Sequence, residues 1–122
     1  MADLCLSFRE DMVRRGMMPP SAHEFALEDM AAANGRECAL SFAGSGADGK
    51  AAERCGHVFF PGCQLAGARG EQVLAVYETL RKDLGSVGLL LQCCGVPAQW
   101  AGEEKLFAET VEALKSTWES LG

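Results

Sequence analysis

Hydrophobic and polar residues alternate with a helical period at the start of the chain. Between residues 3 and 15, hydrophobic side chains recur at spacings of three and four, which predicts a short amphipathic helix. Ser21 lies three residues before Glu24, the spacing of a capping box, and hydrophobic residues continue from there to Asn34 and Gly35. We therefore expect two helices at the N-terminus.

The middle of the chain is less regular. Residues 37–42 are compatible with a strand, and the glycine-rich segment 43–49 that follows has the composition of a loop. Its glycines form a literal G-x-G-x-x-G pattern. In a dinucleotide-binding fold, such a pattern opens a long helix that leads to a second strand. Only a few residues separate Gly49 from the next hydrophobic strand at Val58, so we interpret the segment as a loop.

The second half contains the strongest pattern. Residues 57–60 form a short hydrophobic run, and residues 71–84 carry a helical stripe. Val87 to Leu91 is an unbroken hydrophobic run, typical of a strand buried on both faces. A second helical stripe begins after Glu103 and Glu104, which are acids suited to a helix N-terminus. The order strand, helix, strand predicts a βαβ unit, followed by one more helix.

These elements predict an α/β fold with a small parallel sheet and flanking helices, preceded by the two N-terminal helices. We divide the chain into residues 1–56, a helical linker region with the glycine-rich loop, and residues 57–122, a βαβα unit. A length of 122 residues suits one compact unit with one core.

The composition of the chain excludes some classes of function. The net charge is −6, from 17 acids and 11 bases, and no basic patch is present to neutralise phosphates, which argues against a nucleic-acid partner. No hydrophobic run approaches the roughly 18 residues that a membrane span needs. The N-terminus lacks a cationic leader followed by a hydrophobic segment, so we expect a soluble protein of the cytoplasm. In that reducing compartment, the six cysteines are expected to be thiols or metal ligands rather than disulfides.

Three cysteines occupy the places where an α/β sheet usually binds ligands. Cys63 follows the first strand of the βαβ unit, and Cys93 and Cys94 follow the second. Because parallel strands end at the same edge of a sheet, we expect Cys63 to lie close to Cys93 or Cys94. Thiolates are the ligands that soft metals and iron–sulfur clusters prefer, and Gly62 and Gly95 allow tight bends beside them. The sequence therefore indicates cluster ligation, with the alternative that these cysteines only pack as small buried side chains.

A zinc site is a second alternative. Cys55 and His57 lie near Cys63 in sequence and, with Cys93 or Cys94, would complete a tetrahedral zinc site. That spacing departs from the usual Cys-x-x-Cys pairs. We interpret the remaining two cysteines, Cys5 and Cys38, as packing residues.

The residues around these cysteines also resemble a known family. The run Val58-Phe59-Phe60-Pro61-Gly62-Cys63-Gln64, followed 30 residues after Cys63 by Cys93-Cys94-Gly95, is similar to the cysteine-rich CCG domain. That domain occurs in heterodisulfide reductase and in the iron–sulfur subunits of glycolate oxidase and anaerobic glycerol-3-phosphate dehydrogenase. The similarity covers residues 57–122 and includes the continuation through Val96-Pro97 to Gly102.

The resemblance implies an oxidoreductase subunit that transfers electrons through an iron–sulfur cluster, with Cys63, Cys93 and Cys94 among its ligands. In the family, a later Cys-x-x-Cys completes a set of five thiols around a noncubane four-iron four-sulfur (4Fe-4S) cluster. Because that pair is missing here, we expect this chain to be a fragment without a complete cluster, inactive alone. The implied partners are an upstream ferredoxin-type domain, the downstream Cys-x-x-Cys segment and redox partner subunits. We also expect the fragment to form a homodimer, through an exposed sheet edge or the helical faces beside it.

Overall fold

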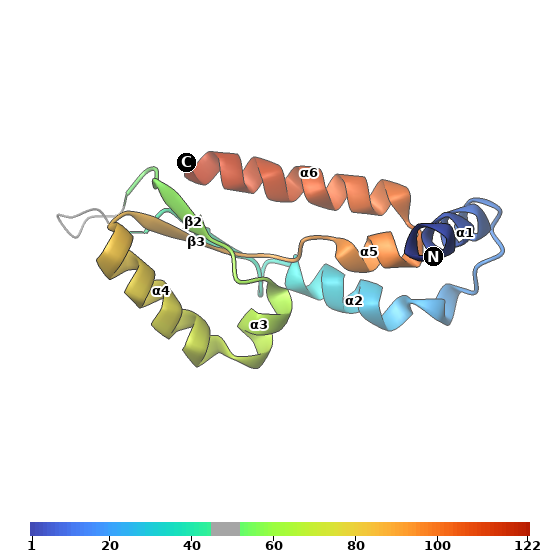
Figure 1. Cartoon of the computed structure of the whole chain (residues 1–122), viewed down its shortest axis with the longest axis horizontal. Helices are drawn as coiled ribbons and strands as arrows, with labels where there is room; N and C mark the ends of the chain where they lie inside the picture. The colour runs from blue at the N-terminus through green and yellow to red at the C-terminus, as the bar shows by residue number, and fades with distance from the viewer. Residues whose placement is uncertain (45–51) are drawn as a thin grey trace.

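The computed structural model describes residues 1–44 and 52–122 (Figure 1), and two of the three glycines of the G-x-G-x-x-G pattern lie outside them. Its strands are β1 (Leu40–Phe42), β2 (His57–Phe59) and β3 (Val87–Leu91). Its helices are α1 (Ala2–Arg14), the 3₁₀ helix η1 (Pro20–Ala22), α2 (Glu24–Ala33), α3 (Cys63–Ala68), α4 (Gly70–Leu84), α5 (Val96–Ala101) and α6 (Glu104–Leu121). The predicted α/β class with flanking helices is confirmed.

The sheet has β3 in its centre, in the order β1-β3-β2. β2 and β3 run parallel, with His57 opposite Val87, as the βαβ pattern predicts. β1 pairs antiparallel with the other edge of β3, with Leu40 opposite Leu91. The sheet is therefore mixed, and its parallel part is limited to β2 and β3. The strand expected within residues 37–42 forms, but only over its last three residues.

Alternating side chains of β3 bury the two faces of the sheet. Val87 and Leu89 pack with Tyr77 of α4 on one face, while Leu90 packs with Leu121 of α6 on the other. This is the period of two that an extended strand imposes. The unbroken hydrophobic run is thus explained by burial on both faces. In Figure 1, α4 and α6 lie on opposite sides of the sheet accordingly.

Three hydrogen bonds fix these helices to the sheet and to the segment before β2. The Tyr77 hydroxyl donates a hydrogen bond to the carbonyl oxygen of Val87 at 2.9 Å. At the end of α6, the carbonyl oxygen of Leu121 accepts hydrogen bonds from the backbone N–H of Cys55, at 2.7 Å, and from its thiol, at 3.2 Å. The segment before β2 therefore caps the C-terminus of α6, whose last carbonyls have no partner within the helix.

The N-terminal helices pack at the other end of the molecule, where α1 contacts α5 (Figure 1). Gly102, with φ +82°, follows α5, and a Cβ placed there would lie 2.8 Å from the backbone carbonyl carbon of Arg9. This close approach of two backbones requires glycine at position 102.

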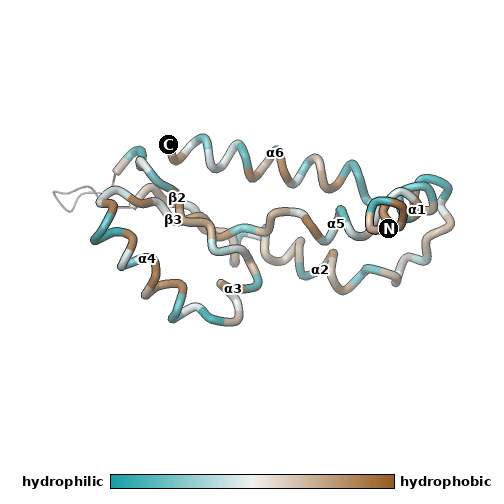
Figure 2. Tube along the Cα trace, viewed as in Figure 1, coloured by the Kyte–Doolittle hydropathy of each residue, from teal (hydrophilic) through white to brown (hydrophobic). Residues whose placement is uncertain are grey.

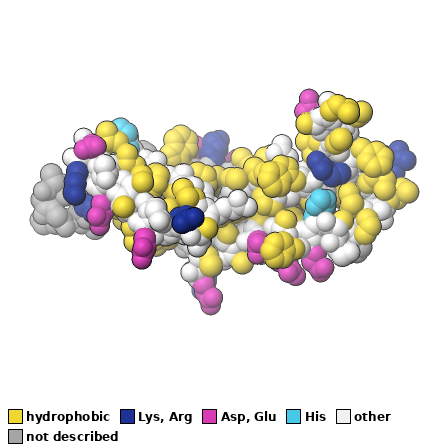
Figure 3. All heavy atoms as spheres, turned by 60° about the horizontal axis from the view of Figure 1, so that its bottom comes forward, with side chains coloured by type: hydrophobic (Ala, Val, Ile, Leu, Met, Phe, Trp, Pro, Cys, Tyr) yellow, Lys and Arg dark blue, Asp and Glu magenta, His cyan; other side chains and the backbone are white. Residues whose placement is uncertain are grey.

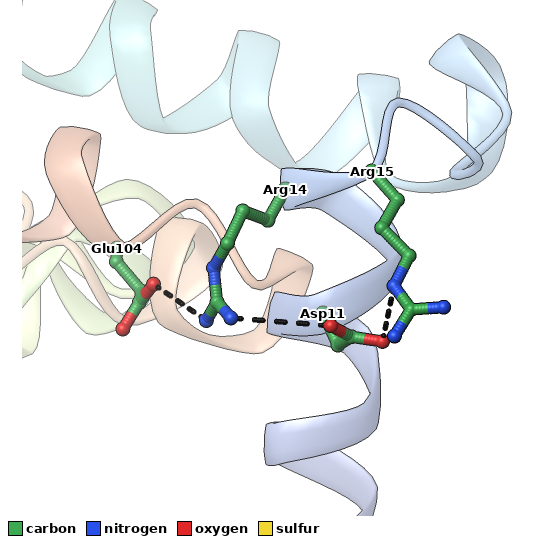
Figure 4. A network of polar contacts seen from close by, with 4 residues as sticks. All are labelled: Asp11, Arg14, Arg15 and Glu104. Carbon is green, nitrogen blue, oxygen red and sulfur yellow. Dashed lines mark ion pairs between the residues drawn. The ribbon is translucent and has the colours of Figure 1, made fainter.

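A network of ion pairs on the surface joins α1 to α6 (Figure 4). Arg14 contacts Asp11 at 3.9 Å and Glu104 at 3.5 Å, and Arg15 contacts Asp11 at 2.9 Å. The arginines and Glu104 are more than half exposed. Exposed pairs contribute about 0–1 kcal/mol each, so the backbone contact at Gly102 is the firmer restraint.

Hydrophobic and hydrophilic residues alternate along α4 and α6, as Figure 2 shows. Many large hydrophobic side chains nevertheless remain exposed, between isolated charged groups on the face shown in Figure 3. Between α6 and the sheet, a hydrophobic groove of about 450 Å³ has Val58, Leu114 and Trp118 among its lining. No helix within residues 1–44 and 52–122 is both long and hydrophobic enough to cross a membrane.

One local prediction about a helix start is wrong, and one short helix was not predicted. Ser21 lies within η1, and α2 begins after His23 without a hydrogen bond from a capping side chain, so the predicted capping box is not formed. The residues between Cys63 and Ala68 form a helix, α3, that the pattern did not indicate. Gly67 and Gly70 weaken the helical signal there, because glycine disfavours a helix by about 1 kcal/mol relative to alanine.

Candidate functional site

Both cysteine segments share one local design, in which a strand ends, a glycine bends the chain and a short helix begins. After β2, Gly62 has φ +83°, and Cys63 is the first residue of α3. After β3, Cys93 and Cys94 precede Gly95, whose left-handed conformation, φ +87°, starts α5. Residues other than glycine rarely adopt such backbone angles, so the two glycines direct both segments out of the sheet. Because β2 and β3 are parallel neighbours, both turns lie at the same edge.

The structure brings Cys63 and Cys93 together. Cys93 is only 1% exposed and forms a buried cluster with Met30 of α2 and Ala98 of α5, and Cys63 packs against that cluster. Cys63 lies near enough to Cys93 to perturb the pKa of its thiol. The expected proximity of Cys63 to one cysteine of the pair is confirmed, and the partner is Cys93.

A side chain from the N-terminal region positions the second cysteine. The amide oxygen of Asn34, the residue that ends α2, accepts a hydrogen bond from the backbone N–H of Cys93 at 2.8 Å. An unpaired N–H in such a buried place would be costly, so this bond fixes the backbone at the site. Asn34 is a site residue that the sequence did not reveal. Its only local signal was its place beside Gly35 at a predicted helix end.

Burial raises the pKa of the Cys93 thiol to about 11. The backbone of Gly95 stabilises the Cys93 thiolate and opposes this rise in pKa, whereas the neighbouring side chains of Cys63 and Cys94 add to it. At neutral pH, Cys93 therefore carries its proton. Because thiolates are the metal ligands, any metal bound by Cys93 must displace that proton.

The third predicted ligand lies in different surroundings. Cys94 is half-buried, whereas its neighbour Cys93 is fully buried. Within the described part of the chain, no three cysteine, histidine, aspartate or glutamate side chains are grouped so that they would hold a metal ion. The donor chemistry thus suits a soft metal or an iron–sulfur cluster, but this arrangement brings two thiols into contact rather than three.

The residues of the alternative zinc site are also separated. Cys55 belongs to the core cluster formed with Leu90 and Leu121, where its thiol donates to the Leu121 carbonyl, while Cys93 belongs to the cluster around Met30. His57 is exposed at the start of β2. The two cysteines are separated because Cys55 packs near the end of α6, whereas Cys93 packs beside α2 and α5.

A pocket of about 400 Å³ opens beside Cys63, between α2, α3 and the end of β3. Asp29, Gln92 and Cys38 contribute polar groups to its wall. We expected Cys38 and Cys5 to be packing residues, but both are exposed, which corrects that interpretation. Cys38 lies in the connection between α2 and β1, and Cys5 lies on a helix none of whose residues is buried.

The fold and the site define a small mixed α/β protein with a pair of thiols at the carboxyl edge of its two parallel strands. Comparison with protein-family models, with curated proteins and with solved structures gives no match to this chain.

Proposed function

We propose that this chain is an electron-transfer module in which Cys63, Cys93 and Cys94 bind part of an iron–sulfur cluster, together with further thiols from outside this sequence. The observation that supports the proposal most directly is the contact between Cys63 and Cys93. They come from segments 30 residues apart and meet at the edge of the sheet where α/β proteins usually bind ligands. The resemblance to the cysteine-rich CCG domain of oxidoreductase subunits supports the same assignment.

The surroundings of the pair favour a redox role over a simple packing role. Cys63 is half-buried and lines a pocket, so it remains accessible to an incoming group. Cys93 lies in a buried hydrophobic cluster of side chains from several helices. Low solvent exposure and hydrogen bonds to sulfur are the factors by which proteins set the potential of a cluster. Cys94 is half-buried and directly follows Cys93, so it is the remaining thiol of this segment that we propose as a ligand.

The test is anaerobic reconstitution of the protein with Fe²⁺ and sulfide, followed by metal analysis and visible absorption. We expect bound iron with sulfide and the broad absorption of thiolate-to-iron charge transfer. Cys63→Ser, Cys93→Ser and Cys94→Ser should each remove most of the bound iron, because each deletes one ligand. Cys5→Ser is the matched control, since Cys5 is exposed on α1.

Other outcomes would contradict the proposal. Equal iron content in the control and in all three site variants would show that the metal binds elsewhere. Zinc without iron would favour a zinc-stabilised structural module. A properly folded protein that binds neither metal would favour an interaction or assembly domain whose cysteines only pack. In the cell, we propose a cytoplasmic location beside a ferredoxin-type electron donor.

A further inference from the structure

Cys63 and Cys93 differ in their access to solvent, although they are in contact. Cys63 is half-buried and lines the pocket of about 400 Å³, whereas Cys93 is 1% exposed and lies among hydrophobic side chains. A molecule in the pocket therefore meets the sulfur of Cys63 first. The sulfur of Cys93 is reached only through Cys63. This asymmetry separates the pair into an attacking thiol and a resolving thiol.

The pocket has the size and chemistry for a small polar molecule. Its volume falls in the range of about 300–1,000 Å³ that is usual for small-molecule sites. Ala33, Ala66 and Leu91 give it a hydrophobic floor, while the Asp29 carboxylate and the Gln92 amide offer hydrogen-bonding groups to a polar ligand. A peptide-like molecule with both amino and amide groups matches these side chains.

We propose that, in the absence of bound metal, Cys63 and Cys93 form an intramolecular disulfide by exchange with low-molecular-weight disulfides of the glutathione type. The inference goes beyond the proposed electron-transfer function and does not depend on it. It rests on the packing of Cys63 against the cluster that contains Cys93, and on the pocket, which is lined by Cys63 and not by Cys93. Two thiols in contact suit a two-electron disulfide, whereas a cluster needs further ligands.

The exchange proceeds in two balanced steps. The thiolate of Cys63 attacks one sulfur of glutathione disulfide, the S–S bond of that molecule breaks, and one glutathione leaves as a thiol after taking up a proton. Cys93 then gives its proton to solvent and attacks the sulfur of Cys63. The bond between Cys63 and the bound glutathione breaks, and the second glutathione leaves as a thiol after taking up a proton. Two electrons pass from the protein dithiol to the small disulfide, which is reduced to two thiols.

Two other cysteines lie near enough to be considered as partners of Cys63. Cys38 lines the same pocket, but it is exposed and is not among the side chains packed against the cluster that contains Cys93. Cys94 directly follows Cys93, but it is half-buried and stands outside that cluster. Disulfides form between cysteines whose Cβ atoms already lie about 3.5–4.5 Å apart. Cys93, in the cluster against which Cys63 packs, is therefore the favoured partner.

The experiment uses the full chain, reduced, freed of metal with a chelator and then incubated with glutathione disulfide. Peptide mapping should show that the free thiols of Cys63 and Cys93 are lost with no glutathione retained on either residue, and the exposed thiols of Cys5 and Cys38 are scored separately. Trypsin cleaves after arginine and lysine, which places Cys63 in the peptide 55–69 and Cys93 in the peptide 83–105. Mass spectrometry without reduction should find these two peptides joined, and fragmentation should assign the bond to Cys63 and Cys93.

Variants give a second and independent measurement. Cys93→Ser should retain one glutathione on Cys63, because the resolving thiol is gone, while Cys5→Ser, which changes an exposed residue of α1, should form the bridge at the wild-type rate. A wild-type chain that keeps six thiols, that retains glutathione on Cys63, or that bridges Cys63 to Cys38 or Cys94 overturns the proposal. Since the sample holds no metal, the result is separate from the outcome of iron reconstitution.

Discussion

The hydrogen bond from Cys93 to Asn34 allows a sharp test of how the N-terminal region supports the site. Asn34→Ala removes the only side-chain oxygen that accepts this N–H, and the geometry permits alanine, because Asn34 has φ −97°. A buried N–H left without a partner costs about 1–3 kcal/mol. We therefore expect the variant to lose that much free energy of unfolding, measured by urea denaturation with tryptophan fluorescence.

The same substitution should expose the site locally. If the lost hydrogen bond stabilises the turn that carries Cys93, a cost of about 1–3 kcal/mol raises the open fraction of that turn by about 5- to 150-fold. Alkylation of Cys93 in native protein, followed by peptide mapping, should accelerate to that extent. Asn34→Asp is the matched control, since a carboxylate oxygen can accept the same bond. An alanine variant within about 0.5 kcal/mol of wild type, or an aspartate variant as unstable as the alanine one, would refute the reasoning.

Two further predictions concern the sheet. Tyr77 is the single tyrosine, and burial raises its pKa above 10.0, so phenolate absorbance of the folded protein should appear at higher pH than that of the unfolded chain. The protonated Tyr77 hydroxyl contributes its full stabilisation below the pKa that Tyr77 has in the unfolded chain. This contribution is lost as the pH rises through the pKa that Tyr77 has in the folded protein. Tyr77→Phe should abolish this loss of stability at high pH. It should also lower the free energy of unfolding by about 1–3 kcal/mol at neutral pH, because the Val87 carbonyl loses its hydrogen-bond donor. A Tyr77 phenol that titrates identically in the folded and unfolded states would contradict the prediction. Gly88→Ala should lower the free energy of unfolding by about 1–3 kcal/mol, since the new Cβ would lie 2.6 Å from the Cys55 sulfur. Gly56→Ala is the control, because a Cβ there would have nothing within 4 Å. Equal stability of the two variants would exclude the packing argument.

The local pattern of hydrophobic residues was sufficient to predict the helices and strands that bury a full hydrophobic face. β3 begins and ends where the hydrophobic run Val87–Leu91 does, because its side chains pack alternately on one face or the other. The contact of Cys63 with Cys93 followed from strand direction alone, since parallel neighbours end at one edge. These features depend on periodicity and handedness, which a sequence carries directly.

The features that could not be predicted depend on partners far away in the sequence. Nothing within Leu40–Phe42 specifies that it pairs antiparallel with β3, because the pairing is set by how the neighbouring helices pack. The side-chain bond from Asn34 spans 59 residues. Cys93 and Cys94 look equivalent in sequence, but neighbouring side chains of an extended segment point to opposite sides, and only Cys93 turns into the cluster.

The central position of β3 has a consequence for synthesis of the chain. Both edge strands precede β3 in sequence and each pairs only with it, so neither can find its partner on the ribosome until residue 91 has emerged. At about 5–20 residues per second, β1 waits several seconds with its hydrophobic side chains uncovered. The sheet therefore assembles in one late event, after β3 has been made.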